Sequence, residues 1–108
     1  MTEAPPASAG DAGRVLVSRV QALSHADLHR LLPRLVAPAE CCFERGAMSA
    51  RFADGRLLEI ALEPEVEHRL GGLRLRSTCF TLAFEGWRTG EIEEFLRHCE
   101  RSLQQGGG

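Results

Sequence analysis

The sequence predicts an α+β fold in which a three-stranded antiparallel meander lies between two helices, with both helices packed on one face of the sheet. Apolar and polar residues alternate on both sides of Asp54-Gly55, a pattern typical of a β-hairpin. Apolar residues recur at helical spacing in residues 24–38 and 89–105, on either side of the predicted strands. A chain of 108 residues suits one domain, which we assign to residues 14–105.

Both ends of the chain are expected to be flexible tails. Residues 1–13 consist mainly of Ala, Pro, Gly and Ser and have too few large apolar side chains to offset the entropy lost on ordering. Residues 106–108 are glycines that follow the last predicted helix. The N-terminus has no basic segment followed by an apolar run, and no apolar run approaches the ~20 residues that span a bilayer, so we expect a cytoplasmic protein without membrane contact.

The segment of residues 14–23 fits two periodicities. Leu16 and Val20 stand at helical spacing, whereas Val15 and Val17 stand at strand spacing. We favour a helix for this segment.

Residues 24–38 predict a helix with a well-defined start. Ser24 is a good N-cap. Asp27 stands at the third helical position, which makes the pattern close to that of a capping box. Pro33 lacks a backbone donor, so the helix is expected to kink or end near Leu32. The apolar face consists of Leu28, Leu31, Leu32 and Leu35.

The register of the predicted hairpin follows from its apolar residues. A two-residue turn at 54–55 would place the apolar side chains of the two strands on opposite faces. A three-residue loop at 53–55, with Gly55 in the left-handed conformation, places them all on one face, and we therefore expect this register. The resulting pairs are Phe52 with Arg56, Ala50 with Leu58, and Met48 with Ile60.

Residues 63–72 predict a polar connection or an irregular strand edge, because Pro64 and two glycines interrupt them. The third strand follows, and its apolar residues change parity along its length. Leu73 and Leu75 share one parity, whereas the phenylalanines further along share the other. This change predicts a bulge or break near residues 77–78.

The last predicted helix is capped by Thr89 and ends at Gly106. Trp87, at the entrance to this helix, is expected to pack the helix against the sheet. The apolar stripe of the helix consists of Ile92, Phe95, Leu96, Cys99 and Leu103.

The second face of the third strand carries Cys79, Thr81 and Ala83. These side chains are small and uncharged, so another sheet or a partner subunit has room to rest on them. We therefore predict self-association of the protein, as a homodimer that uses this face or an edge of the sheet together with the apolar flank of the first helix.

An alternative function is metal or thiol binding. His25 and His29 stand one helical turn apart, a spacing that presents two imidazoles to one metal ion, and Cys41 or Cys42 could complete a ligand set. No CxxC motif supports such a site, and in an intracellular protein all four cysteines are expected to be free thiols. Adjacent cysteines in a strand point to opposite faces, so one of the pair is expected to be buried and the other exposed.

The order helix, three strands, helix resembles the double-stranded-RNA-binding domain over residues 24–105. That resemblance implies a basic cluster at the start of the last helix, where this chain has Glu91, Glu93 and Glu94. With a net charge of −2, we expect no nucleic-acid partner. The same order is similar to that of small dimeric bacterial proteins and secretion chaperones.

The chain shows no Ser/His/Asp arrangement and no phosphate-binding loop. We therefore predict a non-enzymatic interaction or assembly module with a protein partner, no catalytic residues and no cofactor. A third candidate function is the binding of a small ligand in a pocket between the helices and the sheet.

Overall fold

The computed structural model describes residues 14–107, and side chains through Leu103. It has six antiparallel strands in one sheet and two helices, so the expected meander of three strands is wrong. The extra strands are β2, β3 and β6. The elements are β2 (Arg14–Gln21), α1 (His25–Val36), β3 (Glu40–Glu44), β4 (Ala47–Arg51), β5 (Leu57–Leu62), β6 (Val66–Leu70), β7 (Leu73–Glu85) and α2 (Thr89–Gly107). The predicted tail of residues 1–13 lies outside the described residues.

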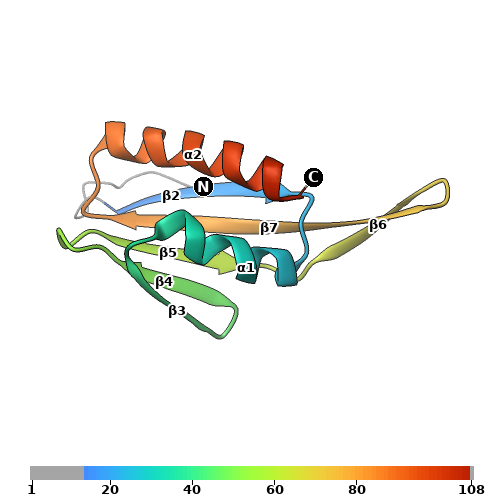
Figure 1. Cartoon of the computed structure of the whole chain (residues 1–108), viewed down its shortest axis with the longest axis horizontal. Coiled ribbons are helices and arrows are strands. Elements are labelled where there is room, and N and C mark those ends of the chain that lie inside the picture. Colours follow the sequence, from blue (N-terminus) through green and yellow to red (C-terminus); the bar gives the residue numbers. More distant parts are fainter. Residues whose placement is uncertain (1–13, 108) are drawn as a thin grey trace.

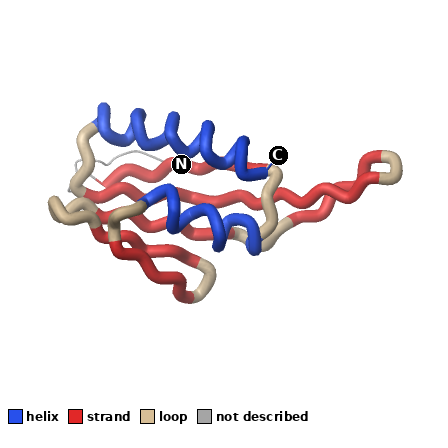
Figure 2. The backbone as a smooth tube through the Cα atoms, in the orientation of Figure 1, coloured by secondary structure: helices blue, strands red, loops and turns tan. Residues whose placement is uncertain are grey.

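The fold has two layers, a sheet and a pair of helices. The strand order is β2-β7-β5-β4-β3, and β6 pairs with the outer part of β7. Both helices pack on the same face of the sheet (Figure 1). The hairpin of β6 and β7 projects beyond the helices (Figure 2). Neither helix of the described chain is both long and apolar enough to cross a membrane.

Strand β2 corrects the expectation of a helix over residues 14–23. Val15 and Val17 stand opposite Phe84 and Leu82 of β7, on the face that the helices cover. β-Branched side chains favour the extended conformation, and β7 pairs with this segment along its whole length, from Arg14 to Gln21. Because that partner comes from the other end of the chain, local periodicity could not reveal it.

The hairpin of β4 and β5 has the predicted register. Ala50 pairs with Leu58 and Met48 pairs with Ile60, and all four side chains are buried. Gly55 has a φ of 96°, a conformation that a residue with a Cβ rarely adopts, and it closes the three-residue loop. Burial of one apolar face therefore selects the register.

Helix α1 begins as predicted and ends later than predicted. The side chain of Ser24 accepts the backbone N–H of Asp27, and the Asp27 carboxylate accepts the N–H of Ser24, which forms a capping box. The helix continues through Pro33 to Val36, so the expected end near Leu32 is wrong. Pro33 costs one intrahelical hydrogen bond. Burial of the last turn, including Val36, offsets that cost.

Strand β7 runs from residue 73 to residue 85 without interruption, so the predicted bulge or break near residues 77–78 is wrong. The extra residue lies instead in the segment that joins β5 to β6, the two strands that pair with β7 on the same side. Between β5 and β6, the three residues 63–65 stand opposite only two residues of β7, 78–79. The side chains of β7 alternate regularly between the two faces of the sheet. Leu73 and Leu75, at odd positions, therefore point away from the face that the helices cover.

The core lies between the helices and the sheet, and Trp87 packs helix α2 against it as predicted. The ring of Trp87 makes edge contacts with Phe84 and Phe95, at centroid distances of 5.0 and 5.4 Å. Its indole N–H donates to the carbonyl of Leu57 at 2.8 Å. Helix α2 continues to Gly107, so the expected stop at Gly106 is wrong; glycine in a helix costs only about 1 kcal/mol relative to alanine.

Candidate protein interface

The face of the sheet opposite the helices is covered by no described element. We call it the open face. Its residues alternate along each strand with those of the core. Cys79, Thr81 and Ala83 of β7 lie on this face, and a hydrogen bond of 3.2 Å joins Thr81 Oγ1 to Ser18 Oγ of β2. Small side chains therefore form the centre of the open face.

Six large apolar side chains also lie on the open face. The register of β2 and β6 against β7 places them on one side of these strands. Each has 45–65% of its surface exposed, and together they expose roughly 600 Å². For comparison, the largest contiguous apolar patch on a typical monomer is about 300–600 Å². We call them the apolar strip: Leu16, Val20, Val66, Leu70, Leu73 and Leu75.

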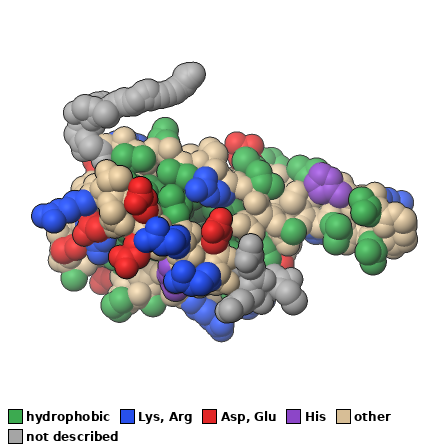
Figure 3. Space-filling model, turned by 90° about the horizontal axis from the view of Figure 1, so that it is seen from above, with side chains coloured by type: hydrophobic (Ala, Val, Ile, Leu, Met, Phe, Trp, Pro, Cys, Tyr) green, Lys and Arg blue, Asp and Glu red, His purple; other side chains and the backbone are tan. Residues whose placement is uncertain are grey.

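Four members of the strip lie on the projecting hairpin, residues 66–77, which we call the arm. Gly71 has a φ of 62° and permits the tight turn at its tip. One face of the arm is apolar, whereas the other carries Glu67, Arg69 and Arg74, which form exposed ion pairs of 3.6 and 3.9 Å. Figure 3 shows hydrophobic side chains gathered along the arm, beside a histidine.

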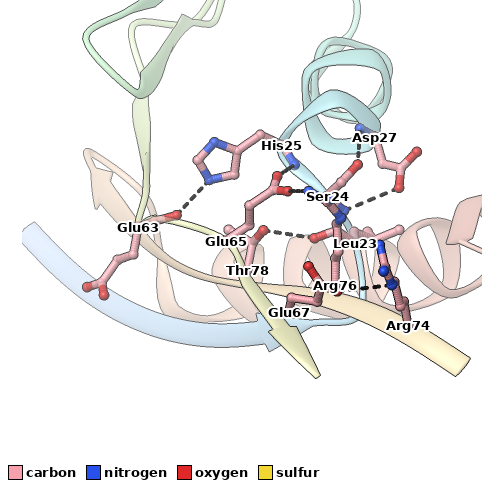
Figure 4. Close-up of polar contacts among 10 residues, drawn as sticks. All are labelled: Leu23, Ser24, His25, Asp27, Glu63, Glu65, Glu67, Arg74, Arg76 and Thr78. Atoms are coloured by element: carbon pink, nitrogen blue, oxygen red, sulfur yellow. Dashed lines mark hydrogen bonds and ion pairs between the residues drawn. The ribbon is translucent and has the colours of Figure 1, made fainter. Parts of the chain in front are cut away.

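The arm is anchored where it meets helix α1 (Figure 4). The backbone N–H of His25 donates to Glu65 Oε1 at 2.7 Å, and Arg76 pairs with the other oxygen of the same carboxylate. The His25 Nε2–H donates to the carbonyl of Glu63 at 2.6 Å. The buried hydroxyl of Thr78 donates to the carbonyl of Leu23 at 2.8 Å. These contacts fix the direction in which the arm leaves the domain.

Substitution of Glu65 by alanine is expected to loosen the arm. The backbone N–H of His25, together with the guanidinium of Arg76, holds the pKa of Glu65 below its ordinary value of 4.5. This carboxylate therefore stabilises the folded arm base above pH 4.5, and the contribution is lost as the pH falls through the lowered pKa. We expect several-fold faster hydrogen exchange of the β6 amides at neutral pH in Glu65→Ala. Glu67→Ala is the control, because the ion pairs of Glu67 among the described residues lie within the arm. Equal exchange in the two variants would contradict this role.

A shallow hollow of about 290 Å³ lies on the open face at the end of the sheet away from the arm. It exists because Ala83 and Ser49 are small and leave space between larger neighbours. Charges of both signs surround it, including an ion pair of 3.8 Å between Arg14 and Glu59. The other lining residues are Ala50, Arg51, Leu57, Leu58 and Glu85.

The structure does not bring the four predicted metal ligands together. The ring of His25 is occupied by the Glu63 carbonyl, and the ring of His29 stacks on Phe43 at 4.2 Å. Cys41 and Cys42 point to opposite faces of β3, the first half-buried and the second exposed. Within residues 14–107, no group of three or more His, Cys, Asp or Glu side chains is arranged to hold a metal ion.

The thiols differ sharply in their surroundings. Cys42 is exposed on the open face, Cys79 is half-buried at its centre, and Cys99 is buried on the side of helix α2 that faces the core. Burial raises the pKa of the Cys99 thiol to about 12, so this thiol stays protonated and unreactive near neutral pH.

Sequence reasoning found the centre of the open face and missed the apolar strip. The signal for the arm was present: apolar residues alternate with charged ones on both sides of the two glycines at 71–72. Leu16 and Val20 gave no comparable signal, because their spacing also suits a helix. No family model, functionally described protein or solved structure matches this chain.

Proposed function

We propose that the protein is a non-enzymatic assembly module that forms a homodimer through its open face and arm. The observation that supports this proposal is the apolar strip. Six large apolar side chains occupy one side of a sheet whose other side is already filled by two helices. Apolar surface of this extent is stabilised when another protein removes it from water.

The area of the strip suits a dimer. Two copies that cover each other's strips remove roughly 1,200 Å² from water through these side chains alone, which reaches the lower bound for specific interfaces. The arm adds a second reason. A two-stranded ribbon is only marginally stable in water, so a partner on its apolar face would stabilise the ribbon as well.

Charge disfavours one edge of the sheet, strand β3, as the contact surface. Glu40 and Glu44 stand on β3, an edge of the described sheet, and are exposed. Charged side chains on an edge strand oppose the addition of another strand. The open face carries charges of both signs at its hollow, and a net charge of −2 raises no strong barrier to self-association.

Analytical ultracentrifugation of the full chain tests the proposal. We expect a species of twice 11.9 kDa to dominate in the micromolar range. Added salt should leave the dimer intact, because apolar contacts are not screened. A single species of 11.9 kDa at the highest concentration would refute the proposal.

A further inference from the structure

We infer that the two copies are related by a two-fold axis near Cys79 and that the arm tip of each copy enters the hollow of the other. This inference rests on the proposed homodimer and specifies its geometry. In a two-fold interface, each surface must fit the same surface of its partner turned by half a turn. The open face meets this requirement along β7.

The arm leucines and the hollow lie at equal distances from Cys79. Leu75 and Leu73 stand four and six residues before it in β7, whereas Ala83 and Glu85, which line the hollow, stand four and six residues after it. Six residues of a strand span about 20 Å. Rotation about an axis at Cys79 therefore places the tip of one arm over the partner's hollow, and the reverse contact forms at the same time.

The centre of the open face permits the close approach that this geometry needs. On β7 the side chains beside the axis are small: Ser77, Cys79 and Thr81. On β2, Ser18 is small, whereas Val20, which stands opposite Cys79, is a larger apolar side chain that would meet its own copy near the axis. Stacked sheets lie about 10 Å apart when side chains of ordinary size separate them. The open side of β7 has small residues in its middle and leucines towards the arm. Two copies therefore pack most closely when their β7 strands run in opposite directions.

The two ends of the open face also match in shape. Leu73 is 63% exposed at the arm tip, and the hollow of about 290 Å³ has room for a leucine side chain. Leu57, 38% exposed, offers an apolar contact in the hollow. The same arrangement brings the arm near Leu16, which stands opposite Ala83 on β2. Both parts of the apolar strip are then covered.

Cross-linking of paired cysteines tests this arrangement. The background variant carries Cys42→Ser and Cys79→Ser, which removes the reactive thiols of the open face. Ser49→Cys at the hollow and Leu73→Cys at the arm tip are then introduced separately and together. Within one chain these positions lie about 30 Å apart along the sheet, so a short bis-maleimide can join them only between copies.

We expect covalent dimers from the variant with both cysteines and none from the background or from either single variant. An equimolar mixture of the two single variants should also give covalent dimers, and tryptic peptides should show residue 49 joined to residue 73. A noncovalent dimer in which Ser49→Cys or Leu73→Cys instead cross-links with itself would overturn the geometry and leave the homodimer standing. A monomer in the ultracentrifuge at every concentration would overturn both.

A steric variant provides a second measurement that needs no cross-linker. Ser49→Arg fills the hollow with a long side chain and is expected to raise the dimer dissociation constant at least tenfold. Cys42→Arg is the matched control, because Cys42 pairs with Ser49 on the same face but lies one strand outside the hollow. Equal weakening by the two variants, or no weakening by Ser49→Arg, would contradict the insertion of the arm tip.

Discussion

Replacement of both Leu73 and Leu75 by arginine is expected to make the protein monomeric. The two leucines are 63% and 45% exposed on the apolar face of the arm, so neither contributes to the core of its own domain. In the proposed dimer they are buried, and each arginine would bring an unpaired charge into an apolar contact. We expect the dissociation constant to rise by about 100-fold or more, which corresponds to about 3 kcal/mol. Sedimentation velocity measures the change directly.

A matched control for this variant lies on the other face of the same arm. Arg69→Gln together with Arg74→Gln changes two exposed side chains that, among the described residues, form ion pairs with Glu67. Exposed pairs of this kind contribute little, so the double glutamine variant is expected to remain dimeric. Circular dichroism should show both variants folded. A dimeric arginine variant, or an equally dissociated glutamine variant, would exclude the apolar face of the arm as the contact.

Truncation of Phe84 to alanine is expected to lower the free energy of unfolding by about 3–5 kcal/mol. Phe84 is fully buried where β7 meets helix α2, and its ring contacts those of Trp87 and Phe95 at 5.0 and 5.9 Å. The variant loses the burial of the ring and leaves a cavity that rigid strands on both sides cannot close. Since small domains have only about 5–15 kcal/mol of stability, much of that stability would be lost.

Urea denaturation at a concentration where the wild type is monomeric measures this loss without a contribution from dimer formation. Leu73→Ala serves as the control, because it also truncates a large apolar residue of β7, but at an exposed position. Its effect should stay within about 0.5 kcal/mol. A loss below about 1 kcal/mol in Phe84→Ala would show that the core does not depend on this ring.

Several features of the fold could be predicted because their signals are local. The Ser24 capping box requires residues only three positions apart, and the register of the β4–β5 hairpin requires only that one apolar face be buried. The packing of Trp87 follows from its size and its place at a helix entrance. In each case, the residues that decide the structure are neighbours in sequence.

The wrong predictions share a different cause. Residues 14–21 form a strand because β7, more than 50 residues later, supplies the backbone partners. The apolar residues of β7 do change parity along the strand, but the predicted bulge is not the cause. A bulge would have buried Leu73 and Leu75 with the rest, whereas the strand alternates regularly and leaves them exposed. The assumption that every large apolar residue faces the core led to this error.

The cap of helix α1, the turn at Gly55 and the small residues on the second face of β7 follow from short stretches of sequence, because they depend on propensities and alternation over a few residues. The predicted cap of α2 is wrong, because Thr89 is the first residue of that helix. Contacts between distant segments set three other features: the first segment joins the sheet, the arm extends past the helices, and Leu16 and Leu73 lie on the same face. Those outcomes depend on which strands meet and in which register, and pairing between distant segments leaves no periodic trace in either one.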